Sequence, residues 1–341
     1  MPRILHVGLG PLGRMIVADV AARGVGRVVA AVDTDPSLQG VRLDDLAPGA
    51  GDAAVTASLE EACGVGCDCA VVSTSSDLAR CAGTFRTLLS RGVSVVSTCE
   101  ELLYPWLRHA ALAEELEGLC ARHGSRLLGT GVNPGFLMDT LPVAATAVCR
   151  GVRGVQVWRI QDASTRRGPF QQKIGAGLDE TEFAARVRAG TLRHVGLGES
   201  LHFVAHYLGL RVDEWHETIE PVRAVREIEW AQGRIEPGKV AGVRQVGVAV
   251  SRSDGVERPV ITLEFQAAIG QADPHDRVMI DAEPRIDLMV KGGVHGDVAT
   301  TAITLNAIPS LLAATPGLHT MATIPIVRCH PGAAGGGPAR V

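Results

Sequence analysis

The feature that most constrains the fold is a glycine-rich turn near the start of the chain. Gly8, Gly10 and Gly13 form the pattern G-x-G-x-x-G directly after the apolar run ILHV, and a helical stretch follows them. Between a strand and a helix, such glycines allow a tight turn and let the backbone approach a pyrophosphate at the helix N-terminus. The pattern therefore predicts a dinucleotide-binding βαβ unit, with Pro11 and Leu12 of the first helical turn also beside the coenzyme.

An acidic residue stands where the second predicted strand ends. The run RVVAAVD places Asp33 at the spacing of about 20 residues from the glycine turn that the dinucleotide fingerprint requires. Its carboxylate is expected to accept hydrogen bonds from the adenosine ribose hydroxyls and to repel a 2′-phosphate. Thr34 rather than an arginine follows it, although Arg42 in the next loop could supply a phosphate contact. We therefore expect NAD(H) as the favoured coenzyme and NADP(H) as the alternative.

The first 140 residues alternate short apolar runs with helical stretches. Runs such as CDCAVVST and VSVVSTCE are apolar without a polar alternation, which is typical of parallel strands covered on both faces. The repeated strand–helix order predicts an α/β fold in which residues 1–140 form a Rossmann domain with a parallel sheet. Within it, Pro105 is expected in the first turn of a helix that runs to about His123.

Polar residues that could take part in chemistry follow several of these strands. In an open parallel sheet, ligands bind beyond the carboxyl ends of the strands, so these residues are expected to share one crevice. Thr74, Ser75 and Asn133 are predicted to contact the coenzyme there. Glu100 and Glu101 lie on the side expected for the nicotinamide, where either carboxylate could accept a proton. The alternative is that both glutamates only begin a helix, whose dipole favours acidic residues in its first turn.

From residue 141 the pattern changes. Segments such as VRQVGVAVSRS and VITLEFQAAI alternate partially, and helical stretches are expected at 178–190 and 198–209. This predicts a second, α+β domain over residues 141–296 with a mostly antiparallel sheet. Residues 297–330 form a predicted helical segment that could return to the first domain. Residues 331–341 lack apolar content and are expected to be disordered.

Composition argues against several kinds of partner. The net charge is −4 and no basic run is present, which argues against nucleic-acid binding. No apolar run approaches the roughly 18 residues of a membrane span, and the chain enters a strand at once without a signal-like segment. We therefore expect a cytoplasmic protein that acts on a small molecule, with no nucleic acid and no membrane as partner.

Two groups of residues suggest metal ligands at first. Cys63, Cys67 and Cys69 have the spacing C-x3-C-x-C, but no second Cys or His pair follows at zinc-site spacing. His202 and His206 are four residues apart on a predicted helix, without the glutamate of an H-E-x-x-H motif. Ordinary packing accounts for both groups, so no metal is expected.

Four segments together resemble one enzyme family. They are STCEELLYP, GTGVNPGFLMDTLP, QKIGAG and GGVHGDVATTAITLNAIP, which begin at residues 97, 129, 172 and 292. With the glycine turn, they are similar over nearly the whole chain to the 2,4-diaminopentanoate dehydrogenase family, the source of native NAD(P)-dependent amine dehydrogenases. The N-terminal part also resembles dihydrodipicolinate reductase.

The resemblance implies reversible oxidative deamination, in which an amine gives a ketone or aldehyde and ammonia. It implies that one glutamate of the STCEE segment is the catalytic acid/base. A looser likeness to homoserine dehydrogenases favours Glu100, with Glu101 as the second candidate. It also implies a homodimer that uses the sheet of the second domain. The candidate substrate contacts are Phe136, Phe170, Lys173 and His295.

Two other functions remain open. A reductase of a preformed cyclic imine, similar to dihydrodipicolinate reductase, would need neither ammonia nor an activated water. A non-catalytic NAD(H)-sensing protein would need only the glycine fingerprint, so the acidic residues at the strand end argue against it. The fold alone does not separate these functions, because the residues of the site decide the chemistry.

Overall fold

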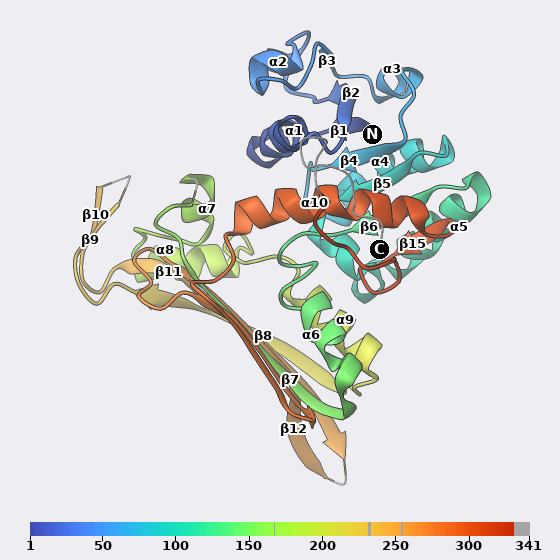
Figure 1. Cartoon of the computed structure of the whole chain (residues 1–341). Coiled ribbons are helices and arrows are strands. Elements are labelled where there is room, and N and C mark those ends of the chain that lie inside the picture. Colours follow the sequence, from blue (N-terminus) through green and yellow to red (C-terminus); the bar gives the residue numbers. More distant parts are fainter. Residues whose placement is uncertain (167, 231–232, 254, 331–341) are drawn as a thin grey trace. The chain divides into compact units, whose positions relative to one another are not determined.

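The computed structural model describes residues 1–166, 168–230, 233–253 and 255–330, which form two compact units (Figure 1). The first unit comprises Met1–Phe136 together with the segment from Gly296 onward, and the second unit comprises Leu137–His295. The tail 331–341, which we expected to be disordered, lies outside the described residues. None of the helices within these ranges has the length and apolar character needed to cross a membrane.

The first unit is built on a seven-stranded sheet in the order β15-β6-β5-β4-β1-β2-β3. Every pairing in it is parallel, which confirms the predicted Rossmann-type sheet. The strands are β1 (Arg3–Val7), β2 (Arg27–Val32), β3 (Val55–Thr56), β4 (Cys69–Val72), β5 (Ser94–Ser97), β6 (Arg126–Gly129) and β15 (Gly317–His319).

Both faces of this sheet are buried, because successive strand residues enter opposite cores. Val95 packs in one core and Val96 in the other, and Leu127 and Leu128 divide in the same way. Side chains that alternate across a strand produce this division. Helices α1 (Pro11–Arg23) and α10 (Gly296–Ala313) cover one face, and α3 (Leu59–Gly64), α4 (Leu78–Ser90) and α5 (Ala110–His123) cover the other. The short helix α2 (Leu43–Leu46) and the 3-10 turn η1 (Pro36–Leu38) lie between β2 and β3.

One predicted helix start was wrong. We expected Pro105 to open the helix that ends at His123, but the structure has two 3-10 turns, η2 (Glu100–Leu103) and η3 (Pro105–Leu107), and α5 begins only at Ala110. The break falls at His109, whose backbone is not helical, with φ −133° and ψ 42°. Its side chain instead reaches Glu101, a contact with η2 that local sequence does not reveal.

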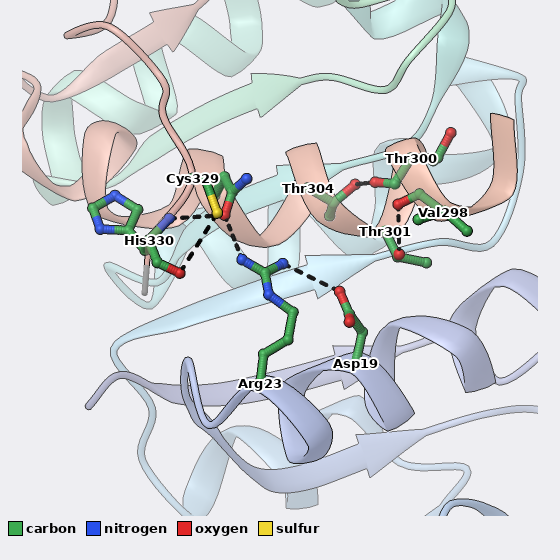
Figure 2. Close-up of polar contacts among 9 residues, drawn as sticks. Asp19, Arg23, Val298, Thr300, Thr301, Thr304, Cys329 and His330 are labelled. Atoms are coloured by element: carbon green, nitrogen blue, oxygen red, sulfur yellow. Dashed lines mark hydrogen bonds and ion pairs between the residues drawn. The ribbon is translucent and has the colours of Figure 1, made fainter. Parts of the chain in front are cut away.

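The C-terminal segment packs on the first unit through α10. Leu305, Ile308 and Leu311 of this helix share a core with α1 and the sheet. Figure 2 shows Arg23 of α1 reaching towards α10, where it donates to Asn306 Oδ1 at 2.7 Å. The backbone N–H of His330 donates to the same oxygen at 3.4 Å. One amide side chain therefore holds α1, α10 and the chain that follows α10 together.

The second unit contains a six-stranded sheet in the order β14-β13-β7-β12-β11-β8. Four of its pairings are antiparallel and only β7 with β12 is parallel, which confirms the mostly antiparallel sheet of the prediction. The strands are β7 (Arg150–Asp162), β8 (Glu214–Arg223), β11 (Val240–Ser253), β12 (Val256–Ala268), β13 (His275–Glu283) and β14 (Ile286–Lys291). A small pair, β9 (Ile228–Trp230) and β10 (Gly233–Ile235), forms a separate antiparallel ribbon.

The helices of the second unit precede its first strand or connect later strands. They are α6 (Thr140–Ala145), the 3-10 turn η4 (Thr146–Val148), α7 (Gly168–Lys173), α8 (Glu180–Arg188) and α9 (Leu197–Leu208). Helix α9 packs on the sheet so closely that a Cβ added to Gly247 of β11 would lie 3.2 Å from the Leu197 side chain. The helical stretches predicted at 178–190 and 198–209 correspond to α8 and α9.

Candidate functional site

The glycine turn brings α1 unusually close to the end of β1. Gly8 has φ +96°, a conformation that side chains rarely adopt, and its carbonyl oxygen accepts hydrogen bonds from His6 Nε2 and Ser73 Oγ, both at 3.0 Å. A Cβ added to Gly13 would lie only 1.8 Å from that oxygen. Glycine is therefore required at both positions for the helix to start against the strand.

His6 stabilises this turn through its hydrogen bond to the carbonyl oxygen of Gly8. It is fully buried in β1, and burial lowers its pKa to about 4, so the ring is neutral at neutral pH. Because the carbonyl of Gly8 can only accept, Nε2 must carry the proton and donate it. Its Nδ1 has no hydrogen-bond partner among the described residues.

The first turn of α1 fits a pyrophosphate. Gly10 is the N-cap, no side chain caps the helix, and Pro11 occupies the first turn, where it lacks an N–H to satisfy. A Cβ added to Gly10 would meet no atom within 4 Å, so space remains beside the backbone of Gly10. Uncapped N–H groups at a helix N-terminus, with room for a ligand beside them, suit an anionic group. Leu12 is half-buried behind this turn.

Asp33 is fixed at the end of β2. One carboxylate oxygen accepts the N–H of Leu9 at 2.5 Å, and the other accepts the N–H of Asp35 at 2.8 Å. Gln39 donates to the backbone oxygen of Asp33 at 2.8 Å. Hydrogen bonds from Ser37 lower the pKa of Asp35, so a second carboxylate beside Asp33 is ionised. The strand end therefore presents a negative region tied to the glycine turn.

The loops after β4 and β6 carry the other expected coenzyme contacts. Thr74 is exposed, and Ser75 accepts the N–H of Asp77 at 3.1 Å, just before Asp77 caps α4 through the N–H of Arg80. Asn133 is half-buried after β6, and Phe136 is 37% exposed at the end of this part of the unit.

The two candidate acids differ in their surroundings. Glu100 and Glu101 both lie in η2, directly after β5. The Oε2 atom of Glu101 accepts the N–H of Leu78 at 2.9 Å and lies 3.0 Å from His109 Nε2. Glu101 thus joins the starts of α4 and α5. Glu100 lies beside it in η2 and is half-buried.

No metal centre is formed by the residues that the structure describes: none of their His, Cys, Asp and Glu side chains gather in a group of three or more suited to an ion. Burial raises the pKa of Cys63, Cys67 and Cys69, so these thiols are protonated at neutral pH. His202 Nδ1 donates to Gly198 O of its own helix at 2.8 Å.

The second unit holds a buried ion pair beside the segment that carries His295. Arg159 of β7 is 1% exposed and donates to Asp276 Oδ1 at 2.7 Å. The other oxygen of Asp276 accepts the N–H of Val294 at 2.7 Å, and Gln161 donates to Val294 O at 3.0 Å. Burial lowers the pKa of Arg159, and the Asp276 carboxylate opposes that change. The pair thereby anchors the loop that precedes His295.

The same network reaches Phe170, which shares a helix with Lys173. Arg166 donates to Gln161 Oε1 at 3.1 Å and lies 3.9 Å above the centre of the Phe170 ring. Phe170 and Lys173 both belong to α7, where Lys173 is exposed. Three of the predicted substrate contacts, Phe170, Lys173 and His295, therefore lie on two segments that converge on the buried ion pair.

His194 is a buried, neutral residue with several cations near it. Burial lowers its pKa to about 3, helped by the charges of the nearby cations Lys173, Arg159, Arg193 and Arg166. Its ring stacks on Phe265 with centroids 4.4 Å apart. Gln245, which is fully buried, accepts the N–H of His194 at 2.7 Å and donates to its carbonyl at 2.9 Å. The imidazole is thus held neutral and in a fixed position.

Sequence reasoning found one group of residues and missed another. The structure brings the expected coenzyme residues and both glutamates to the carboxyl ends of neighbouring strands in the first unit, and the expected substrate residues Phe170, Lys173 and His295 to one region of the second. Sequence reasoning missed His6, His109, Arg159 and His194. A histidine inside an apolar strand just before the glycine turn was a usable signal for His6, whereas the others depend on contacts between distant segments.

The chain is similar to several known proteins. Residues 136–335 match the family model of the 2,4-diaminopentanoate dehydrogenase C-terminal domain. The 2,4-diaminopentanoate dehydrogenase of Acetoanaerobium sticklandii is 27% identical over 96% of this chain and 94% of its own. An amine dehydrogenase of Streptomyces virginiae is 23% identical over 69% of this chain and 70% of its own.

A solved structure has the same fold. The amine dehydrogenase from Mycobacterium smegmatis superposes with a TM-score of 0.82 at 23% identity, covering 97% of this chain and 98% of that one. The match of the family model covers more than half of the chain, and the strand-end acids and the loop before His295 lie in segments that had suggested the same family. This chain belongs to the 2,4-diaminopentanoate dehydrogenase family.

Proposed function

We propose that this chain is an NAD(P)-dependent amine dehydrogenase, which converts an amine to a ketone or aldehyde and ammonia and catalyses the reverse reductive amination. The observation that carries the proposal is the placement of Glu100 directly after β5, in the row of strand ends that bears the dinucleotide fingerprint. The relatives named for amine oxidation support it.

The first unit supplies the residues that would hold the coenzyme. The N–H groups at the start of α1 suit the pyrophosphate, with Gly8, Gly10 and Gly13 allowing the approach, and Asp33 suits the ribose hydroxyls. Two neighbouring acidic residues, Asp33 and Asp35, disfavour a 2′-phosphate there, which supports NAD(H) over NADP(H). When bound, the nicotinamide coenzyme accepts or donates the hydride of the reaction.

The role of Glu100 follows from proton balance. In the deaminating direction, its carboxylate takes one proton from the substrate ammonium and leaves a neutral amine, whose carbon can then lose hydride to give an iminium. Glu100 next passes that proton on and removes one from a water that attacks the iminium carbon. Collapse of the resulting carbinolamine releases ammonia and the carbonyl product. General base catalysis of this kind contributes about 10² to 10⁴ in rate.

The second unit suggests the substrate class. Lys173 and Arg166 lie close enough to His194 to lower its pKa, and Lys173 is exposed on α7. A carboxylate on the substrate would be stabilised there, whereas the ring of Phe170 suits an aliphatic chain. We therefore infer an amine that also carries a carboxylate, with His295 as a further polar contact.

We extend the proposal to assembly and location. Strand β14 is at the edge of its sheet and exposes Leu288, Met289 and Val290. Exposed apolar residues on an edge strand support the homodimer that the family resemblance implies. We also propose that the protein is cytoplasmic.

The test is coenzyme oxidation at 340 nm with a panel of ketones, aldehydes and keto acids of matched length, each with and without ammonium. We expect consumption that needs both the carbonyl compound and ammonium, is faster with NADH than with NADPH, and has a lower KM for keto acids. Consumption without ammonium would indicate an imine or ketone reductase instead. Tight NADH binding without turnover on any compound would favour the sensor.

Glu100→Gln tests the assigned base. The amide has the same shape but cannot accept a proton, so we expect kcat to fall by about 10² to 10⁴ while the Kd for NADH stays unchanged. Fluorescence titration measures the Kd, and steady-state assays measure kcat. A variant with the turnover of the wild-type protein would show that the proton acceptor is another residue.

A further inference from the structure

We infer that Glu101 and His109 form a positioning pair that fixes Glu100 against the loop after β4. The inference rests on the proposed amine dehydrogenase function, because it divides the roles of two adjacent acids in that site. All contacts that carry it lie within the first unit.

The carboxylate of Glu101 is held by two donors from different helices. Its Oε2 atom accepts the N–H of Leu78, the first residue of α4, at 2.9 Å, and lies 3.0 Å from Nε2 of His109, the N-cap of α5. The side chains of Glu101 and His109 are only 19% and 25% exposed, so water competes little for these bonds. A carboxylate engaged in this way connects α4 and α5 to η2 and is held in one orientation.

The residues on either side of Glu100 are tied to the same atom of the β4 loop. The carbonyl oxygen of Ser76 accepts the N–H of Glu101 at 3.3 Å and the thiol of Cys99 at 3.3 Å. One residue further back, the N–H of Thr98 donates to Val72 O at 3.1 Å. The turn that carries Glu100 therefore has little freedom to move relative to the loop that carries the coenzyme contacts Thr74 and Ser75.

This arrangement gives Glu101 a positioning role in which it transfers no proton. A base must lie within hydrogen-bond reach of the proton that it removes, and a displacement of about 1 Å can reduce the rate by about 10²-fold. Without the Glu101 carboxylate, the first N–H of α4 and the His109 ring would lose their shared acceptor, and η2 would lose its side-chain link to both helices. Glu101 and His109 thus act on the reaction through Glu100.

Conservative and disruptive variants of each residue separate positioning from catalysis. In Glu101→Gln the amide oxygen can still accept both N–H groups, so we expect most of the wild-type kcat. In Glu101→Ala both bonds are lost, and we expect kcat to fall by about 10²-fold with little change in the KM for the carbonyl substrate. His109→Gln retains a donor near the position of Nε2 and should be nearly as active as the wild-type protein, whereas His109→Leu should lower kcat as Glu101→Ala does.

Glu115→Ala is the matched control. It breaks the ion pair between Arg86 of α4 and Glu115 of α5, which join at 2.6 Å on the surface away from the strand ends. It therefore weakens a contact between the same two helices without touching η2. We expect wild-type kcat, and thermal unfolding of all variants shows whether each is folded at the assay temperature.

The kcat values of these variants distinguish a positioning role of Glu101 from a catalytic one. If Glu101→Gln loses as much kcat as Glu100→Gln, then Glu101 accepts the proton and the inference is wrong. It is also wrong if the folded Glu101→Ala and His109→Leu variants both keep wild-type kcat, or if the control loses as much. Should the alanine variant not fold, the His109→Gln and His109→Leu pair gives the same answer. Failure of the proposed function shows separately, as wild-type NADH consumption that does not need ammonium.

Discussion

Two glycines of the same turn should respond to the same substitution in opposite ways. Gly13→Ala places a Cβ 1.8 Å from the carbonyl oxygen of Gly8 and 2.9 Å from His6 Nε2. Since such contacts are not observed below 3.0 Å, helix α1 or the turn must move by at least about 1.2 Å. Gly10→Ala, only three residues away, places its Cβ where no atom lies within 4 Å.

The magnitudes follow from these distances. Overpacking against a backbone atom held by two hydrogen bonds costs about 1–3 kcal/mol or more, and the better helix propensity of alanine offsets up to about 1 kcal/mol. We therefore expect Gly13→Ala to lower the free energy of unfolding by about 1–2 kcal/mol. For Gly10→Ala we expect a change within about 0.5 kcal/mol, as for substitutions that touch nothing.

NADH binding should distinguish the two variants in a second way, through an effect at Gly10. If the pyrophosphate approaches the backbone at Gly10, its added methyl group should weaken NADH binding by about tenfold, equivalent to 1.4 kcal/mol, without loss of stability. Urea unfolding measures stability, and fluorescence titration measures the Kd. Wild-type affinity in Gly10→Ala would refute the assigned path of the pyrophosphate. Wild-type stability in Gly13→Ala would refute the close contact between α1 and the turn.

Two further predictions concern buried ionisable groups. The pKa of His6 is lowered from 6.5 to about 4, so the unfolded chain binds a proton at a higher pH than the folded one. Relative to His6→Leu, the free energy of unfolding of the wild-type protein should be constant above pH 6.5 and decline by about 3 kcal/mol between pH 6.5 and 4. Urea unfolding at pH 7.5 and 4.5 tests this. An identical pH dependence of the two proteins would contradict the neutral, buried ring. Asp276→Ala leaves Arg159 charged and buried without its partner and should destabilise the protein by about 3–5 kcal/mol, with Arg159→Met together with Asp276→Leu recovering much of it; calorimetry of the three proteins checks this.

The parts of the fold that were predictable are those set by local pattern. The glycine turn and the apolar runs gave the parallel strands of the first unit, because each run has both the length and the neighbours of a buried strand. The order of strands and helices then indicated that Asp33, Thr74 and Glu100 would follow strand ends in one row, which the sheet order bears out.

The parts that were not predictable depend on contacts between distant residues. Arg159 and Asp276 are 117 residues apart, and nothing near either one in sequence indicates a shared buried site. The break before α5 has a similar cause, since His109 contacts Glu101 across a turn that the proline pattern had suggested would be helical. The proposed division of roles between the two adjacent glutamates likewise rests on a contact with the start of α4 that the local sequence does not reveal.

The return of α10 and β15 to the first unit has a consequence for synthesis of the protein. A nascent chain that has emerged only as far as Phe136 lacks the strand that pairs with β6 and the helix whose Leu305, Ile308 and Leu311 complete one core. The nucleotide-binding unit, although it is made first, can be completed only after the whole second unit has left the ribosome. Until then one face of its sheet stays partly uncovered, so the second unit is folded, in effect, as an insertion within an unfinished first one.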